Sequence, residues 1–258
     1  MENKLFYLTN SKLETFENCP YQYKLKYIDW VKPSDKPKAV SFLGNMVHYF
    51  INKFLRSDKS YKNFIGKWDK YFRWYFKRYK NEYSEMYRIK VSDLYNRSLY
   101  CLDNFNKIYN TFKYDKLKSE YKVECKYNDD ILLCGYIDVI YKLGDIFTIH
   151  DWKTQKQLSQ KDANEYKQQI FFAYLVYKKF GQIPNVYLDH LITGKQYQIE
   201  IKEDKFDDLK KRIEKLYIMD RQRNDIEFKK NPRNCFFCGY YRICSSEKKR
   251  LYLDLSSF

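Results

Sequence analysis

The chain has 258 residues, enough for one elaborated domain with a full hydrophobic core. Its 49 Lys and Arg exceed its 33 Asp and Glu, and the net charge of +16 favours a polyanionic partner such as nucleic acid, although a compositional bias toward Lys and Tyr contributes to it. No apolar run is long enough to span a bilayer and residues 1–10 lack a signal-peptide core, so we expect a soluble, intracellular protein of the cytoplasm with no membrane partner.

Two helices are predicted near the beginning of the chain. A capping-box pattern at Ser11 opens the first, and Pro20 interrupts it. The second covers residues 41–55 and carries His48 near its centre. Gly44 lies four residues earlier on the same helical face, where a glycine permits close approach of another element. A lone histidine on a helix is more often a core residue than a ligand, so this pattern alone leaves the role of His48 open.

The next segment, residues 61–90, is the most aromatic part of the chain, and its rings recur at helical spacing with Lys and Arg between them. We expect an amphipathic helix that packs on the core. The alternative is that some of the rings stack the bases of a single strand along a basic channel. A further helix is predicted over about residues 91–113, and these helices are expected to cover the active-site side of a sheet that follows them.

Strands and helices follow one another in the remaining part of the chain, which predicts an α/β fold with a mixed sheet flanked by helices. Strands are expected at about residues 118–127, 132–142, 146–152, 184–192 and 196–202. One helix is expected between a cap at Asp162 and Gly181, and another over residues 205–224.

A predicted hairpin over residues 135–153 brings charged groups together. Asp138 lies on its first strand, and its second strand ends in Asp151, Trp152 and Lys153. Lys153 points to the same face as Asp151, because strand side chains alternate. Two acids in apolar surroundings are costly unless a positive charge lies between them, and a divalent cation with oxygen ligands supplies one. The simpler alternative is an exposed strand end with a salt bridge.

Seven cysteines, an odd number, argue against a disulfide framework in a reducing compartment. Cys235, Cys238 and Cys244 have the spacing C-x2-C-x5-C, and three thiolates this close in sequence can wrap one metal centre when a fourth comes from elsewhere. Cys19, which precedes Pro20, is the obvious fourth ligand. Tetrahedral Zn2+ also takes four thiolates, so the spacing leaves the kind of centre open. The other cysteines are expected to be core residues: Cys101, Cys125 and Cys134.

These residues occur in an order that resembles the RecB-like branch of the PD-(D/E)XK nuclease superfamily, and the resemblance covers nearly the whole chain. The residues that carry it are Cys19-Pro20, His48, Asp138, Asp151-x-Lys153, Gln169, Cys235, Cys238 and Cys244. Within this branch the chain is similar to the iron–sulfur nucleases, which include the CRISPR-associated adaptation nuclease, exonuclease V and the nuclease domain of the AddB helicase subunit. The resemblance implies a restriction-endonuclease-like α/β fold with a mixed central sheet, an N-terminal helical region and termini stapled by an iron–sulfur cluster.

The same resemblance implies one RecB-like nuclease domain over residues 1–258. Its expected parts are a helical N-terminal part, 1–115, a catalytic α/β core, 116–226, and an iron–sulfur segment, 227–258, that packs with Cys19. A 4Fe-4S cluster is expected at the four cysteines, with Zn2+ as the alternative.

The resemblance also implies a metal-dependent DNA nuclease, with exonuclease action on single strands or free ends as the expected activity. The ligands expected to hold Mg2+ or Mn2+ are Asp138, Asp151, the Trp152 carbonyl and His48. Lys153 is expected to orient or help deprotonate the attacking water, and Gln169 to assist it. Glu124 and Tyr174 are secondary candidates; the family pattern places a tyrosine four residues after the glutamine, where this chain has Ala173.

No Gly-x4-Gly-Lys-Ser/Thr motif occurs, so ATP-driven unwinding would come from a partner such as a helicase, and an integrase is the other partner considered. The alternative function is a non-catalytic DNA-binding module in a recombination, repair or CRISPR spacer-acquisition complex. The complete set of two acids and a lysine argues against that alternative. An RNA nuclease is a third interpretation, which the sequence does not distinguish from a DNA nuclease.

Overall fold

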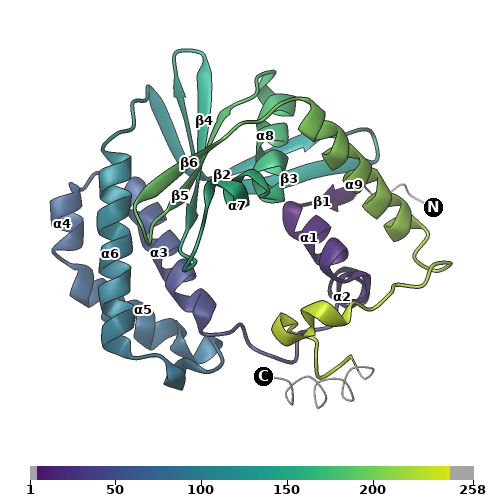
Figure 1. Cartoon of the computed structure of the whole chain (residues 1–258), viewed down its shortest axis with the longest axis horizontal. Helices are drawn as coiled ribbons and strands as arrows, with labels where there is room; N and C mark the ends of the chain where they lie inside the picture. The colour runs from purple at the N-terminus through teal and green to yellow at the C-terminus, as the bar shows by residue number, and fades with distance from the viewer. Residues whose placement is uncertain (1–4, 245–258) are drawn as a thin grey trace.

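A computed structural model describes residues 5–244 of the chain, in which helices flank a six-stranded mixed sheet (Figure 1). The strands are β1 (Phe6–Leu8), β2 (Lys116–Lys126), β3 (Ile131–Leu143), β4 (Ile146–Lys153), β5 (Asn185–His190) and β6 (Lys195–Ile199). Paired strands are antiparallel except for β1 with β3 and β4 with β5, which are parallel. The α/β class and the mixed sheet are therefore confirmed. Within the described residues, no helix is long and apolar enough to cross a membrane.

Three strands pair with the central strand β3. β2 pairs with β3 along one edge. On the other edge, β1 pairs with residues 131–133 of β3 and β4 pairs with residues 139–143. The last pair between β3 and β4 is Val139 with His150, after which β4 continues beside β5. This divergence opens the sheet next to that pair. The sequence does not predict β1, because three residues are too few to show an alternation.

Most of the predicted helices are present, with changes at their ends. The α-helices are α1 (Asn10–Asn18), α2 (Pro20–Tyr23), α3 (Val40–Leu55), α4 (Tyr61–Ile65), α5 (Trp68–Tyr79), α6 (Val91–Tyr109), α7 (Gln160–Asn164), α8 (Lys167–Phe180) and α9 (Asp204–Arg221). Shorter helical turns are the π-helix η1 (Lys24–Ile28) and the 3-10 turns η2 (Lys80–Glu82), η3 (Met86–Arg88) and η4 (Pro232–Phe237). The predicted aromatic helix is thus divided into α4, α5 and two turns. The cap of α1 is Thr9 rather than Ser11, and its hydroxyl accepts a hydrogen bond from the Lys12 amide at 3.3 Å.

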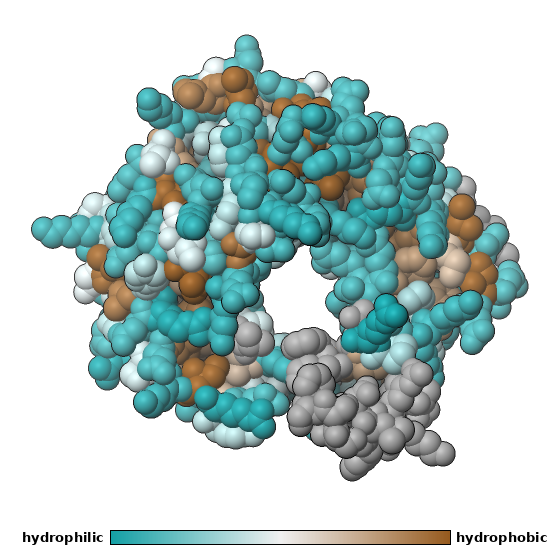
Figure 2. All heavy atoms as spheres, in the orientation of Figure 1, coloured by the Kyte–Doolittle hydropathy of each residue, from teal (hydrophilic) through white to brown (hydrophobic). Residues whose placement is uncertain are grey.

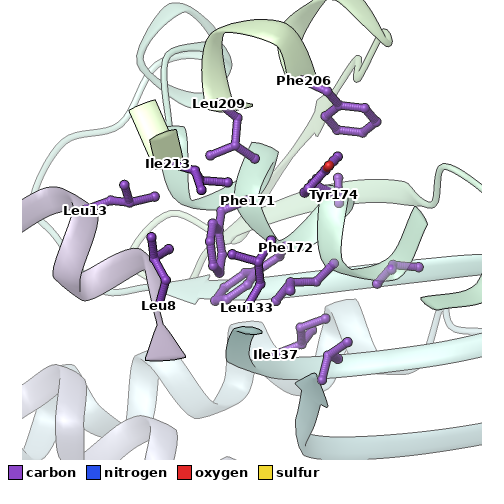
Figure 3. Packing of buried hydrophobic residues seen from close by; sticks show 14 of the residues in the cluster. Leu8, Leu13, Leu133, Ile137, Phe171, Phe172, Tyr174, Phe206, Leu209 and Ile213 are labelled. Carbon is purple, nitrogen blue, oxygen red and sulfur yellow. The ribbon is translucent and has the colours of Figure 1, made fainter. Parts of the chain in front are cut away.

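One hydrophobic cluster fills the space between the sheet and helices α1, α8 and α9 (Figure 3). Phe171 and Phe172 of α8 belong to it together with Leu133 and Ile137 of β3. Gly135 of β3 leaves room for α8, since a Cβ atom at this position would lie 2.9 Å from the Phe172 ring. Helix α8 therefore packs directly on the central strand.

A second hydrophobic cluster joins α3, α5 and α6 to β4 through Trp152. The indole is 2% exposed and meets the Phe105 ring of α6 edge to face, with centroids 5.4 Å apart. Because Trp152 lies between Asp151 and Lys153, burying its ring fixes the backbone on which both charged side chains stand. Cys101 of α6 is buried in the same cluster, as predicted.

The helices of the second cluster and the region around α1 and α2 stand on either side of an opening (Figure 1), which Figure 2 shows to be bordered mainly by hydrophilic residues. The linker between η1 and α3 crosses below it and contacts the segment after η4. The amides of Ser34 and Asp35 both donate to the Gly239 carbonyl, at 2.8 and 3.1 Å. Arg242 pairs with Asp35 at 3.0 Å, so the linker and this segment are held together.

Helix α3 approaches the end of β4 at a glycine. A Cβ atom added to Gly44 would lie 2.9 Å from Oγ1 of Thr154, the residue after Lys153, and no ordinary side-chain contact is that short. The close approach predicted for Gly44 is therefore confirmed. It brings His48, about one helical turn further on, to the end of β4.

Replacing Gly44 with alanine is expected to destabilise the protein by about 1–3 kcal/mol, because the added methyl group overpacks the contact with Thr154. In a helix interior, alanine is otherwise more favourable than glycine by about 0.5–1 kcal/mol. Gly44→Ala should therefore become stabilising in a Thr154→Ala background. Denaturant unfolding of the four proteins measures this coupling, and additive effects would contradict the contact.

Candidate active site

Three carboxylates lie at one level across neighbouring strands where β4 leaves β3. His150 is the last residue of β4 that pairs with β3, and its partner is Val139. Asp151 comes directly after His150 and Asp138 directly before Val139, so the two aspartates are neighbours across the gap. On the other edge of β3, Ser119 of β2 pairs with Val139 and Tyr121 pairs with Ile137. Glu120 therefore lies opposite Asp138. Such a group of acids is costly unless cations accompany it.

Glu120 has an unusual backbone, with φ of +46°, in the left-handed region that disfavours a side chain. The residue before it is tied to α3. The Arg56 guanidinium donates to the Ser119 carbonyl at 3.2 Å, and the Ser119 hydroxyl donates to the Asn52 side chain at 2.7 Å. Burial and the charge of Asp138 raise the pKa of Glu120. The sequence analysis missed Glu120, since it lies in no motif and alternation does not reveal a left-handed residue within a strand.

His48 of α3 joins two parts of the site. Its Nε2 donates to the Trp152 carbonyl at 2.9 Å, and its Nδ1 lies 3.4 Å from Oδ2 of Asp138. Burial alone would lower the pKa of His48, but the charges of Asp138 and Asp151 raise it to about 9. Without a metal ion the imidazole is therefore protonated at neutral pH, and a divalent ion held by Nδ1 would take the place of that proton.

Lys153 supplies a second cation. Its Nζ lies 2.6 Å from Oδ2 of Asp151 and donates to Oε1 of Gln168 at 3.0 Å. The same ammonium group makes a cation–π contact with the Tyr166 ring, whose centroid is 5.3 Å from Nζ. Burial would lower the pKa of Lys153, but the charge of Asp151 raises it, so the side chain keeps its proton.

The two aspartates titrate in opposite directions because their partners differ. Burial alone would raise the pKa of Asp138, but the His48 charge and a hydrogen bond from the Trp152 amide, 2.9 Å long, hold it below its usual range. The pKa of Asp151 is raised by burial and by the charge of Asp138, against the effect of Lys153. Asp151 is thus the better proton acceptor of the pair.

A candidate metal site lies among these groups. The ligand atoms of His48, Glu120 and Asp138 all lie within 4.8 Å of one another, so one divalent ion can reach all three. Carboxylate oxygens with an imidazole nitrogen suit Mg2+ and better still Mn2+. Compared with the predicted ligands, Glu120 joins His48 and Asp138, while Asp151 is paired with Lys153 and the Trp152 carbonyl lies beside His48.

The site opens into a cavity of about 1110 Å3 between the sheet and the helices α3, α5 and α6. The acids, His48 and Lys153 form one wall. The helices and the turns between them contribute tyrosines, cations and two further acids to the lining, and these residues are Tyr49, Tyr75, Tyr79, Tyr83, Arg88, Lys90, Arg97, Glu82 and Asp93. A cavity that offers cations and aromatic rings beside the cluster of acids can receive a phosphate-bearing chain.

Gln168 occupies the place predicted for Gln169. Gln168 lines the cavity and accepts the hydrogen bond from Lys153. Gln169 is 1% exposed, and its amide atoms have no hydrogen-bond partner among the described residues. The side chains of successive helical residues point about 100° apart. A prediction that is wrong by one position therefore names a residue whose side chain points away from the cavity.

The two secondary candidates lie away from the cavity. Tyr174 is packed in the first hydrophobic cluster beside Phe206 of α9, with ring centroids 5.1 Å apart (Figure 3). Glu124 pairs with Lys122 on the surface of β2, at 2.6 Å. The structure therefore brings neither of them to the acids, and Glu120 is the glutamate of β2 that lies there.

The four predicted cysteine ligands line one small cavity. They are Cys19, Cys235, Cys238 and Cys244. The Asn231 amide donates to the sulfur of Cys19 at 3.4 Å, and Figure 1 shows the segment around η4 beside α2. The structure thus joins the beginning of the chain to its C-terminal part. Of the cysteines predicted to be core residues, Cys125 of β2 and Cys134 of β3 are only partly buried, so the prediction is wrong for these two.

A sequence model of the PD-(D/E)XK nuclease superfamily matches residues 7–245, and the chain belongs to this superfamily. Among solved structures, a protein of Eubacterium rectale described as a "Putative exonuclease" is 12% identical, with a TM-score of 0.56 over 97% of this chain and 93% of that chain. The protein SSO0001 is 11% identical, with a TM-score of 0.36 over 79% of this chain and 96% of that chain. No curated protein matches. The first of these likenesses shows a shared fold.

The pKa of His48 gives the site a measurable pH dependence. Folding raises this pKa from its ordinary 6.5 to about 9, so the stability that protonated His48 contributes is complete below pH 6.5 and is lost as the pH rises through 9. We expect EDTA-treated protein to lose more stability over this range than the His48→Gln variant, whose amide has no charge to lose. Urea unfolding at several pH values measures this difference, and parallel curves would contradict the assignment.

Proposed function

We propose that this protein is a metal-dependent nuclease that hydrolyses phosphodiester bonds of DNA. The proposal is carried by the convergence of Glu120, Asp138, Asp151, His48 and Lys153 where β4 leaves β3. Membership of the PD-(D/E)XK superfamily, whose nucleases use divalent metals, supports it. A module that only binds DNA would gain nothing from buried acids beside the path of a phosphate, since each would repel it.

The donor set of His48, Glu120 and Asp138 fits Mg2+ or Mn2+, which when bound would polarise the scissile phosphate and the attacking water. Lys153 keeps its proton, so it is a poor base and instead offsets the negative charge that develops on the phosphorane. Asp151 accepts the proton of the water as the water oxygen attacks phosphorus. The bridging oxygen then leaves and takes a proton from solvent. Gln168 holds Lys153 in place through its hydrogen bond.

We propose a RecB-like exonuclease domain, extending over residues 1–258, that acts inside the cell on single-stranded DNA or free ends. The order of the motif residues along the chain, the net charge of +16 and the cations in the cavity wall support this assignment. We propose an ATP-driven helicase or an integrase as its partner protein. The cellular process would be DNA repair or CRISPR spacer acquisition.

Asp151→Asn and Lys153→Met are expected to slow cleavage of end-labelled DNA by at least about 100-fold in Mg2+ or Mn2+, because each removes a charge required in the transition state. Binding of the same DNA, measured by anisotropy, should change little. Glu120→Gln should also weaken Mn2+ binding by more than about tenfold, as seen by calorimetry. Glu124→Gln, on the same strand but paired with Lys122, is the matched control. Unchanged cleavage by the Asp151 and Lys153 variants would contradict the proposal.

We further propose that the four cysteines hold a 4Fe-4S cluster. Their common cavity supports a shared metal centre. Four thiolates also suit a tetrahedral Zn2+ ion. The spacing C-x2-C-x5-C together with Cys19, which resembles that of the iron–sulfur nucleases, is the reason to prefer a 4Fe-4S cluster to zinc. Such a centre would close a loop of most of the chain.

Cys19→Ala is expected to lose the iron, the brown colour and part of the thermal stability of anaerobically purified protein, because it removes the ligand that joins the two ends of the chain. Cys125→Ala, which changes a cysteine outside this cavity, is the matched control and should keep its iron. Elemental analysis distinguishes the alternatives. Stoichiometric zinc without iron would contradict the cluster, and equal melting temperatures with neither metal would contradict any such centre.

A further inference from the structure

Three side chains at the edge of the catalytic cavity form an aromatic ledge that the mechanism does not use: Tyr49, Lys53 and Trp74. We infer that this ledge stacks an unpaired base of a DNA strand whose phosphate lies in the active site. The inference rests on the proposed nuclease function and adds to it a residue that sets the preference for single strands.

The geometry of the ledge suits a flat ligand. Trp74 of α5 stacks on Tyr49 of α3, with ring centroids 5.9 Å apart and an angle of 30° between the planes. Lys53 places its ammonium group 5.6 Å from the centroid of Tyr49 and 5.7 Å from that of Trp74. The ledge thus combines an extended aromatic surface with a cation that can pair with the phosphate next to a stacked base.

Packing against the second hydrophobic cluster covers only part of Trp74. The buried face of α5 consists of Trp68, Phe72 and Tyr75, and Trp68 is 1% exposed. Trp74 is 47% exposed, directly after the exposed Arg73, and its ring lies beside that face, with the Tyr75 centroid 6.4 Å away. The indole therefore extends the aromatic cluster to the surface, where its uncovered part can stack on a further flat ring.

The ledge is continuous with the active site through Tyr49. This residue follows His48 on α3 and lines the catalytic cavity together with Asn52. Tyr79 of α5 lines the same cavity and meets the Trp74 ring edge to face, with centroids 6.0 Å apart. An aromatic surface therefore runs from the cavity wall to the exposed indole. A strand whose scissile phosphate lies at His48 would place a neighbouring nucleotide beside it.

The chemistry of stacking explains why the ligand would be an unpaired base. In a duplex each base is stacked between its neighbours and cannot offer a face to the protein, whereas a single strand exposes its bases and loses little when one moves. The excess of positive charge on the chain complements the phosphates of such a strand. Loss of one stacking contact weakens single-strand binding by about 5- to 100-fold.

Tryptophan fluorescence tests the inference, because a stacked base quenches the indole that it covers. Of the four tryptophans, Trp68 and Trp152 are buried, and Trp30 is the other exposed one, at 77%. In an Asp151→Asn background, which prevents turnover, a short oligothymidylate should quench the Trp30→Phe protein. It should leave the emission of the Trp74→Phe protein unchanged. Equal quenching of both would overturn the inference.

Two further variants separate stacking from folding and from catalysis. Trp74→Phe keeps a flat ring and should bind the oligothymidylate with nearly parental affinity, whereas Trp74→Leu should bind about 5- to 100-fold more weakly while binding duplex unchanged. Parental affinity of Trp74→Leu would overturn the inference even if the protein is a nuclease. Conversely, Trp74-dependent quenching by a protein that cleaves no DNA would support the ledge and refute the proposed activity.

Discussion

The concentration of three carboxylates at the divergence of β3 and β4 is the constraint on which the rest of the site depends. Glu120, Asp138 and Asp151 repel one another, and burial removes the water that would screen them. Two groups offset this repulsion when no metal is bound, the Lys153 ammonium at the end of β4 and the protonated His48 imidazole on α3. Helix α3 therefore contributes to the candidate active site, and its contact with β4 at Gly44 sets where the imidazole lies.

The local departure from regular pairing makes this concentration achievable. Within a continuous ladder, the Trp152 amide would donate to a backbone carbonyl, but beyond the last pair with β3 it donates to the Asp138 side chain instead. The Trp152 ring is held in the second hydrophobic cluster, so the backbone cannot turn to another partner. Helical packing thus holds the divergence open, and a ladder bond is replaced by a bond to the Asp138 carboxylate.

The sequence predicts the hairpin and its charged end correctly because both depend on local signals. Alternating apolar residues locate β3 and β4, and the motif locates Asp138, Asp151 and Lys153. Local signals do not reveal Glu120. Its side chain lies at the site because its backbone is left-handed, and the contact of Arg56, at the end of α3, with Ser119 holds that conformation. The choice between Gln168 and Gln169 fails for a related reason: the motif gives a residue type, but the rotation of α8 on β3 decides which side chain meets Lys153.

The charge of the whole chain and the charge of the site have opposite signs, and this contrast separates binding from cleavage. The net charge of +16 favours a polyanionic ligand even without a metal, and Arg88, Lys90 and Arg97 line the cavity itself. The last few ångströms bring a phosphate toward the acids, where His48 and Lys153 are already engaged with Asp138 and Asp151. Further positive charge is needed at that point, which a divalent ion on the acids would supply. In the proposed nuclease, the cations that line the cavity therefore contribute to binding of the strand, and the acids contribute to its cleavage.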